Sequence, residues 1–225
     1  MNQKLFSKVF IAVLLLLCHK GFGQVIFSED WSSSSFTTNG WTFPSGQANW
    51  TVGAAYTPTG GTSPNAYFNW FPNIFNYSNE LVSPVINATA YSGGSVFLSY
   101  KLQLNNFGAG TVEQFAIEYK TISSPSWFLL TNYSNAGLGG TVLNWNPTNV
   151  VLPGMAGQQF QIRFRAYGPN SWWINGWGVD DINVLALNPC SGTPNAGTAV
   201  ATPNNPCPAD CVTLSLNGAS IAGGL

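Results

Sequence analysis

From Val25 onward, the chain is a succession of short apolar or alternating segments, and clusters of Gly, Pro, Asn and Ser separate them. No stretch repeats its apolar residues with the 3.6-residue period of an amphipathic helix, so almost no helix is expected. Strands are predicted at 25–27, 49–52, 66–70, 80–86, 96–104, 112–121, 127–131, 142–145, 150–152, 158–167 and 178–185. Many short strands at this spacing predict an all-β sandwich or barrel.

Two of these segments show which side of a strand faces the core. In 158–167 every second side chain is large and apolar, namely Phe160, Ile162 and Phe164. The side chains between them are polar or charged, namely Gln161, Arg163 and Arg165. The segment 112–121 alternates in the same way. Successive side chains of a strand point to opposite faces, so each of these strands should have one buried and one wet face.

The first residues have the layout of a secretory signal peptide. Lys4 and Lys8 precede an uncharged apolar run at 9–18, and small residues follow at 21–24. This run is about half of the roughly 20 residues that a membrane-spanning helix needs, and no comparable run occurs later. Residues 1–23 are therefore predicted to be a leader that is cleaved after Gly23, with no membrane span. The alternative is a short helix buried in the core.

Removal of this leader changes the chemistry that the chain can perform. The only histidine, His19, would be lost, and three of the seven basic residues would be lost with it, leaving four against eight acidic residues. The four that remain are Lys101, Lys120, Arg163 and Arg165. Nucleic-acid binding needs a clustered basic surface, so it is disfavoured. A weakly charged exterior rich in Asn, Ser, Thr and Gly indicates a secreted or cell-surface protein.

Residues 24–187 are expected to form one domain, and the composition changes after it. The segment 188–205 is rich in Pro, Gly, Thr and Asn and is predicted to be a linker. A strand is predicted at 212–216, but residues 206–225 are too few to bury a core and are interpreted as the truncated start of a further domain. The cysteines left after cleavage are Cys190, Cys207 and Cys211. An odd number in an exported protein indicates a missing or intermolecular partner.

A series of motifs runs in order through residues 24–187. They are Phe27-Ser28-Glu29-Asp30, Gly40-Trp41, Ala66-Tyr67-Phe68, Glu80-Leu81-Val82-Ser83-Pro84, 96–100, Trp127, Gln161-Ile162-Arg163-Phe164 and Gly178-Val179-Asp180-Asp181-Ile182. This succession resembles the MAM-like jelly-roll modules, especially the bacterial choice-of-anchor J or cleaved-adhesin branch. The resemblance implies a jelly-roll β-sandwich of two antiparallel sheets. The disulfide cysteines of animal MAM domains are absent, which favours the bacterial branch.

The residues after the linker carry a second resemblance. The stretch 190–197 followed by Cys207 and the segment 212–218 is similar to the opening of Ig-like repeats in secreted multidomain proteins of Bacteroidetes. Such repeats continue through a Trp-containing strand that does not follow here, which supports the interpretation of a fragment.

Most enzyme classes lack necessary parts in the exported chain. Serine and cysteine nucleophiles usually need a neighbouring histidine, and zinc hydrolysis usually needs imidazole ligands. Glycoside hydrolysis needs only two carboxylates on one face. Glu113 and Glu118 are five positions apart in one predicted strand, so they should point to opposite faces. A non-catalytic protein is therefore predicted.

Half of the acidic residues lie in two doublets, Glu29-Asp30 on the first strand and Asp180-Asp181 on the last. The ends of a sandwich domain can be neighbours, and a calcium ion ligated by oxygens would offset the repulsion between these carboxylates. The MAM-like resemblance implies a structural calcium in this region, held by Glu29 and Asp180. In the alternative interpretation, Asp180 and Asp181 accept hydrogen bonds from turn amides or pair with Arg163 and Arg165.

Aromatic residues are twice as frequent as charged ones, at 14% against 7%, and not all of them can be in the core. The segments 69–77 and 171–177 are predicted loops that place aromatic side chains beside Asn, and the candidate ligand-binding residues are Trp70, Tyr77, Trp172 and Trp173. Indole faces stack on sugar rings while amides bind hydroxyls. The alternative is that these loops fold back and cap the sandwich, which is favoured for Trp177.

These features predict a non-catalytic adhesion or ligand-binding module of a larger secreted or cell-surface protein, with an extracellular glycan or a surface protein as its partner. A second possibility is a carbohydrate-binding module attached to a secreted degradative enzyme. A third is a structural spacer.

Overall fold

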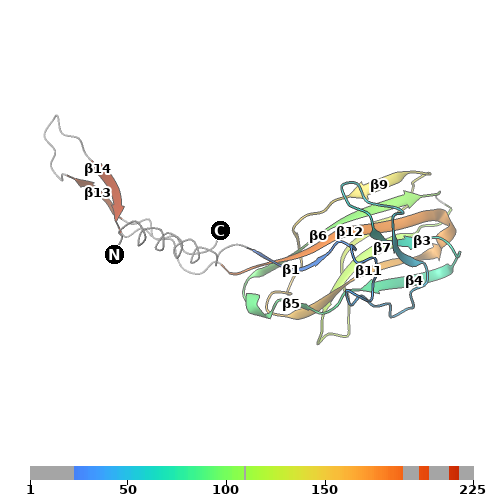
Figure 1. Cartoon of the computed structure of the whole chain (residues 1–225), viewed down its shortest axis with the longest axis horizontal. Helices are drawn as coiled ribbons and strands as arrows, with labels where there is room; N and C mark the ends of the chain where they lie inside the picture. Colours follow the sequence, from blue (N-terminus) through green and yellow to red (C-terminus); the bar gives the residue numbers. More distant parts are fainter. Residues whose placement is uncertain (1–22, 109, 190–197, 203–212, 218–225) are drawn as a thin grey trace, which may run out of the picture. The chain divides into compact units, whose positions relative to one another are not determined.

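Two antiparallel sheets pack face to face in residues Gly23–Leu187 of the computed structural model (Figure 1). The structure describes residues 23–108, 110–189, 198–202 and 213–217. Sheet A contains β1 (Gln24–Glu29), β2 (Trp50–Gly53), β3 (Asn65–Asn69), β6 (Ser95–Asn106), β9 (Val142–Trp145), β10 (Val150–Val151) and β12 (Ile174–Leu187). Sheet B contains β4 (Phe75–Val82), β5 (Ile86–Asn87), β7 (Gln114–Thr121), β8 (Phe128–Ser134) and β11 (Gln159–Asn170). The predicted jelly-roll β-sandwich is confirmed.

Strand β12 is the centre of sheet A, where the order is β10-β6-β12-β3-β2 and β1 also pairs with β12. Sheet B has the order β4-β11-β7-β8. Two 3₁₀ turns, η2 (Thr89–Tyr91) and η3 (Ser171–Trp173), are the helical elements described. Among the described residues, no helix has the length and apolar character that crossing a bilayer requires.

Aromatic side chains from both sheets fill the space between them. Trp177 of β12 stacks on Phe115 of β7, with ring centroids 5.1 Å apart. Trp50 of β2 lies 6.2 Å from the same Phe115 ring, and Trp41 lies 6.1 Å from Phe164 of β11. Large aromatic side chains bury much apolar area each, so these contacts are a main source of stability for the sandwich. The preferred interpretation of Trp177 as a core residue is correct, because its side chain is fully buried.

A loop between β2 and β3 covers the outer face of sheet A and explains two glycines of β12. A Cβ atom on Gly176 would lie 2.4 Å from the Tyr56 ring, and one on Gly178 would lie 1.8 Å from the Tyr56 carbonyl oxygen. The loop can therefore approach the strand only because both positions lack a side chain.

A bulge interrupts the alternation of β12 at the second acidic doublet. The pairing of β12 with β6 shifts between Asp180 and Asn183, and Asp181 adopts a left-handed backbone with φ of 48°. The extra residue allows Val179 and Ile182 to be fully buried although they are three positions apart. Aspartate tolerates this backbone region better than most residues, which explains why an acidic residue occupies the position.

Each predicted strand of the body is present, and the differences lie at their ends. The segment 80–86 is divided between β4 and β5, and β12 begins at Ile174 inside a predicted loop. The predicted leader, 1–23, lies almost wholly outside the described residues.

The described residues after the body include a strand pair. Strand β13 (Thr198–Thr202) pairs with β14 (Thr213–Asn217) in an antiparallel hairpin. Strand β14 matches the segment predicted at 212–216, whereas β13 falls inside the predicted linker 188–205.

Candidate functional site

Two adjoining hollows open at one end of the sandwich. The first has a volume of about 80 Å³ and is lined by Trp70, Phe107, Trp172 and Asn175. The second has a volume of about 260 Å³ and is lined by Asn105, Asn106, Phe107, Gly140, Thr141, Val142 and Asn175. Both hollows are lined by Phe107 and Asn175, so they adjoin, and we call the two together the aromatic groove.

Three aromatic rings form the wall of the groove. The rings of Trp70 and Trp172 meet edge to face, with centroids 4.9 Å apart and planes at 88°. Phe107 meets Trp172 at 5.9 Å, also edge to face. Such pairs are worth about 0.5–1.5 kcal/mol beyond the area they bury, so the rings hold one another in place. Even so, Trp172 remains 44% exposed and Phe107 51% exposed, which leaves ring surface open to a ligand.

The groove forms where several strands of sheet A end or begin together. Trp70 follows the last residue of β3, and Phe107 follows the last residue of β6. The start of β12 lies between them, because Gly176 pairs with Asn69 of β3 and with Asn105 of β6. Residues far apart in the chain therefore meet at this end through strand pairing.

Side-chain amide groups also line the groove. The side-chain amide of Asn175 donates a hydrogen bond of 2.8 Å to Oδ1 of Asn105, and the carbonyl oxygen of Asn175 accepts one from the Trp70 amide at 3.3 Å. These bonds fix the orientation of Asn175, which lines both hollows. The groove thus combines apolar walls with a few placed polar groups, as small-molecule sites generally do.

A buried polar network holds the loops that carry the groove. The side-chain amide of Asn106 donates to the carbonyl oxygens of Gly108 at 2.9 Å and Gly139 at 2.8 Å. Asn135 donates to Oδ1 of Asn106 at 3.2 Å and accepts a hydrogen bond of 2.8 Å from the Glu113 amide. Asn106 and Asn135 are both buried, and satisfied polar groups in the interior confer a single geometry.

The same network extends to the turn that presents Trp172. The Glu113 carboxylate is fully buried and accepts a hydrogen bond of 3.0 Å from the backbone amide of Asn170. Oδ1 of Asn170 in turn accepts from the Trp172 amide at 3.1 Å and caps η3. Ser171 donates from its hydroxyl to the Trp70 carbonyl oxygen at 2.9 Å. Trp70 and Trp172 are therefore fixed by hydrogen bonds as well as by ring contact.

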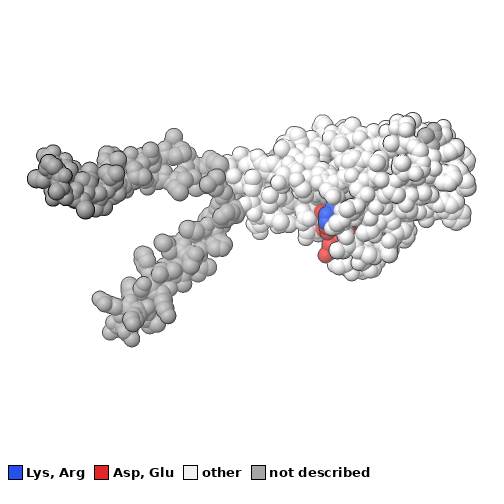
Figure 2. Space-filling model, turned by 90° about the horizontal axis from the view of Figure 1, so that it is seen from above, with Lys and Arg blue, Asp and Glu red and all other residues white. Residues whose placement is uncertain are grey.

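No lining residue of the groove is charged. On the face shown in Figure 2, the charged side chains likewise gather in one small cluster, and the remaining described surface is uncharged. A groove of this composition suits a neutral, polyhydroxylated ligand better than an ionic one.

The candidate ligand-binding residues divide into three groups. Trp70 and Trp172 lie together in the groove. Trp173 lies beside it but packs on Gly108 and Gly110, and a Cβ atom on Gly110 would come within 2.0 Å of its ring. The expectation of a loop at Tyr77 is wrong, because Tyr77 lies in β4, is only 7% exposed and stacks on Phe68 at 5.3 Å. Burial, together with the Glu113 carboxylate, raises the pKa of Tyr77 above its usual range.

Phe107 and Asn175 were not among the predicted site residues. The sequence does carry a signal for Phe107, because it follows Asn105 and Asn106 just as the predicted aromatic residues stand beside Asn. Asn175 could have been found in the same way, since it lies within the segment 171–177.

The structure places the first acidic doublet in a network of its own. Glu29 is buried, and its two carboxylate oxygens accept hydrogen bonds from the Trp31 amide at 2.9 Å, the Asn39 side chain at 2.9 Å and the Trp41 indole at 2.8 Å. Asp30 is exposed, and the Ser32 hydroxyl lowers its pKa, together with a hydrogen bond of 3.0 Å from the Ser32 amide. Both acids are satisfied by neighbours in the chain.

The second doublet matches one part of its alternative interpretation. Oδ2 of Asp180 accepts a hydrogen bond of 2.7 Å from the loop amide of Thr62. Asp181 pairs with Lys101 rather than with Arg163 or Arg165. The pKa of Asp180 is raised to about 6, chiefly because its carboxyl group is buried.

Glu29 and Asp180 lie on opposite faces of sheet A. Glu29 pairs with Ile182, a core residue, whereas Asp180 pairs with Lys101 on the outer face. Within the described ranges, no three His, Cys, Asp or Glu side chains gather closely enough to hold a metal ion. The structure thus does not bring Glu29 and Asp180 together, and calcium binding by the doublets stays a prediction.

No protein-family model and no curated protein matches the chain. Three of the similar solved structures have TM-scores of 0.46. The tandem CBM22 domain of Xyn10C from Paenibacillus barcinonensis is 14% identical, over 73% of this chain and 50% of that one. A non-crystalline cellulose specific carbohydrate-binding module, CBM28, is 11% identical, over 73% and 96%. A cyclase from Fischerella sp. TAU is 15% identical, over 73% and 99%. The chain thus spans half of the tandem structure, and likenesses of this degree do not indicate a ligand.

Proposed function

We propose that this protein is a non-catalytic module that binds a neutral extracellular glycan through the aromatic groove. One observation carries the proposal. Trp70 and Trp172 form a corner of two perpendicular indole rings, and Trp172, which remains 44% exposed, lines one hollow together with Asn175.

The chemistry of this corner matches that of a sugar ring. One face of a pyranose carries C–H groups that pack on an aromatic ring, and its hydroxyl groups lie at the edge, where amides donate and accept hydrogen bonds. In the groove, aromatic walls and amide groups lie within one hollow, so a single sugar residue can contact both. The absence of a lining charge favours a neutral glycan over a uronic-acid polymer.

The position of Glu113 supports binding rather than hydrolysis. Glycosidases place two carboxyl groups on either side of the scissile bond, about 5 to 9.5 Å apart. None of the groove-lining residues is acidic, and Glu113, which bonds to the turn that presents Trp172, is fully buried. Its Oε1 atom is occupied by the Asn170 amide. A bound glycan would therefore meet no acid pair here.

We place this module in a larger secreted or cell-surface protein that adheres through it. The leader-like start and the resemblance to MAM-like adhesion modules motivate this part of the proposal, and a role beside a degradative catalytic domain would use the same groove.

Affinity electrophoresis of the full chain in gels that contain soluble neutral polysaccharides tests the proposal. Xylan, β-glucan, mannan and hydroxyethyl cellulose are suitable probes. Retardation is expected with at least one of them, and Trp70→Ala or Trp172→Ala should weaken binding by about 1 to 3 kcal/mol, the range for a fully buried large side chain. That corresponds to roughly 5- to 150-fold in Kd.

Trp127→Ala is the matched control. Trp127 lies beside sheet B, where Lys120 and Arg163 stack on its ring at 4.8 Å and 4.5 Å, and its removal should leave retardation unchanged. The proposal is wrong if no neutral polysaccharide retards the protein, or if the Trp127 variant loses as much affinity as the Trp172 variant.

A further inference from the structure

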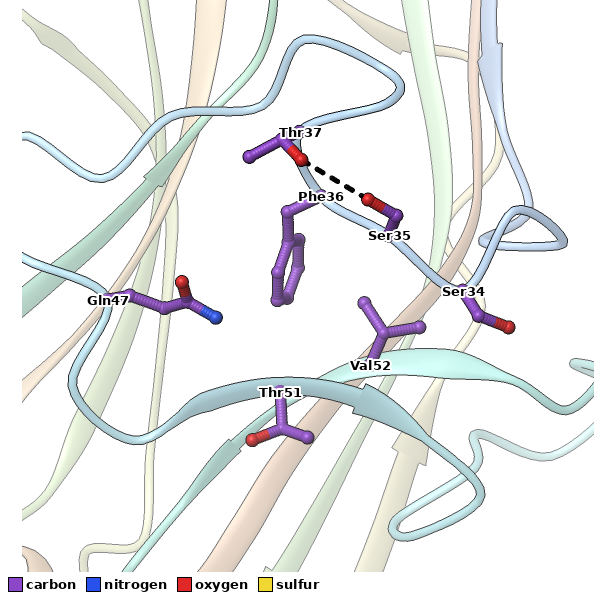
Figure 3. Close-up of a pocket in the computed structure, with 7 residues that line it drawn as sticks. All are labelled: Ser34, Ser35, Phe36, Thr37, Gln47, Thr51 and Val52. Carbon is purple, nitrogen blue, oxygen red and sulfur yellow. Dashed lines mark hydrogen bonds between the residues drawn. The ribbon is translucent and has the colours of Figure 1, made fainter.

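A separate hollow of about 260 Å³ lies away from the aromatic groove, between the loop that follows β1 and the free edge of β2 (Figure 3). Hydroxyl and amide side chains line most of it, namely Ser34, Ser35, Thr37, Gln47 and Thr51. Phe36 and Val52 complete the lining. We call this hollow the hydroxyl pocket. It shares no lining residue with the groove.

The polar groups of the hydroxyl pocket retain hydrogen-bonding capacity. The hydroxyl groups of Ser35 and Thr37 face each other at 3.3 Å, and either one can be the donor (Figure 3). The Gln47 side chain makes a single long hydrogen bond, of 3.5 Å, to the Trp50 carbonyl oxygen. A hydroxyl group has one donor and two acceptor sites, and a carboxamide has two donors and an acceptor oxygen. The Ser35 hydroxyl also accepts a hydrogen bond of 3.3 Å from the Thr38 amide, so the Thr37 hydroxyl and the Gln47 carboxamide keep the most capacity for a ligand.

The apolar part of the pocket is held rigidly. Phe36 is buried and packs edge to face on Trp31 at 5.4 Å and on Phe43 at 4.9 Å. Its ring, the Val52 side chain and the Gln47 amide point into the space between the loop and β2 (Figure 3). A fixed apolar surface beside free hydroxyl groups offers a ligand a preformed site, which lowers the entropic cost of binding.

The backbone of β2 adds a further donor and acceptor. β2 is the last strand of its sheet and pairs only with β3 along its length. The Asn69 amide donates to the Asn49 carbonyl oxygen at 2.8 Å, which marks these two residues as a bonded pair. Antiparallel ladders alternate bonded and non-bonded pairs, so Val52, three positions after Asn49, forms a non-bonded pair with Ala66. The N–H and C=O of Val52, a residue that lines the pocket, therefore point away from β3 to the free edge of the sheet.

We propose that the hydroxyl pocket binds one neutral sugar residue, independently of the aromatic groove. The lining has no charged side chain, so the ligand is neutral. Its polar side chains are exposed or partly exposed to water in the free protein, and the hydroxyl groups of a polyhydroxylated ligand can replace those water contacts. The volume lies below the roughly 300–1,000 Å³ of pockets for drug-sized ligands, so it fits a single residue rather than a chain.

Amide chemical-shift titration of the isotope-labelled full chain tests the proposal, with D-glucose, D-galactose, D-mannose and D-xylose as probes. At least one sugar should shift the amide signals of Thr37 and Val52 in a saturable manner. Gln47→Met and Thr37→Val should each weaken this binding about two- to tenfold, the effect expected for one hydrogen bond.

Two control variants distinguish binding in the hydroxyl pocket from binding in the groove and from a general loss of structure. Thr131→Val removes a hydroxyl group from β8, on the other sheet, and should leave the titration unchanged. Trp172→Ala should also leave it unchanged while reducing retardation by polysaccharide, so the two sites can fail separately.

The proposal is overturned if none of the four sugars shifts the Val52 signal. It is also overturned if the shifts persist in both Gln47→Met and Thr37→Val with unaltered affinity.

Discussion

The backbone amide of Asn170 donates a hydrogen bond of 3.0 Å to the buried carboxylate of Glu113. Asn170 also caps the turn that presents Trp172, so a single interior carboxylate determines where an exposed indole stands. This hydrogen bond joins the start of β7 to the turn that precedes β12. It predicts that a substitution of the buried Glu113 will change ligand binding in the groove.

Glu113→Gln should therefore lower both stability and ligand binding. The substitution keeps the size of the side chain but replaces a charge-assisted hydrogen bond, which is worth about 1.5–3 kcal/mol, by a neutral one. Thermal unfolding and polysaccharide affinity are the measurements. Glu80→Gln, which removes a partner of Arg163 on sheet B, serves as the control and should leave affinity unchanged. Equal affinity in the two variants would contradict the link.

Glu118→Gln should destabilise the sandwich by roughly 3 kcal/mol, because it leaves Arg163 and Arg165 without their shared partner in a largely buried network. By contrast, Lys101→Met breaks a more exposed pair with Asp181 and should cost about 0–1 kcal/mol. Denaturant unfolding at pH 7 compares the two. A smaller loss for Glu118→Gln than for Lys101→Met would refute this ranking.

The Glu118 network should also make the stability of the protein decrease on acidification. Burial alone would raise the pKa of Glu118, but hydrogen bonds from Arg165 and Arg163 outweigh it and hold the pKa below its usual 4.5. The contribution of Glu118 is therefore present above about pH 4.5 and is lost as the pH falls through the lowered value. The stability difference between wild type and Glu118→Gln should shrink on acidification. A constant difference from pH 7 to pH 3 would exclude this linkage.

Asp180 should have the opposite effect and make the protein less stable as the pH rises. Its carboxyl is fully buried and its pKa is raised from 3.8 to about 6, so the folded protein holds this proton more tightly than the unfolded chain. Its ionisation penalty is absent below about pH 4 and complete above about pH 6. Relative to Asp180→Asn, the wild type should lose on the order of 1–3 kcal/mol between pH 4 and pH 7. If the free energies of unfolding of the two proteins changed equally between pH 4 and pH 7, this effect of Asp180 would be disproved.

The predicted calcium ion requires the melting temperature to rise with calcium and to fall with chelator. A shared ion would make both Asp180→Asn and Glu29→Gln insensitive to calcium. Saturation at about 100 times Kd would stabilise the native state by about 2.7 kcal/mol. Because the two carboxylates lie on opposite faces, the comparison of these variants is decisive. An identical melting curve with calcium and with chelator would rule out the ion.

Much of the fold could be predicted because alternation along a strand is a local property. The pattern Phe160, Ile162, Phe164 identifies β11 and its buried face without any knowledge of the neighbouring strands. The bulge at Asp181 could not be read in this way, since it is visible only as a shift in pairing between β12 and β6. The same shift separates Asp180 from Glu29, which the sequence pattern had placed together.

The candidate site was predictable only in part, for a related reason. Exposed Trp beside Asn identified Trp70 and Trp172, but their meeting with Phe107 depends on the long-range pairing of β12 with β3 and β6. Tyr77 has the same local surroundings in sequence as Trp70, and only the register of β4 against β11 shows that it is buried.

Strand β12 begins at the groove and ends at Leu187, next to the start of β1, where Gln24 pairs with Ala186. At about 3.3 Å per residue, the 14 residues of this strand span roughly 45 Å. Tension between a ligand bound in the groove and the chain at Gln24 or Leu187 would thus act along the strands of sheet A. The hydrogen bonds of β12 with its neighbours would be loaded together in shear rather than unzipped one by one, an arrangement suited to bearing mechanical load.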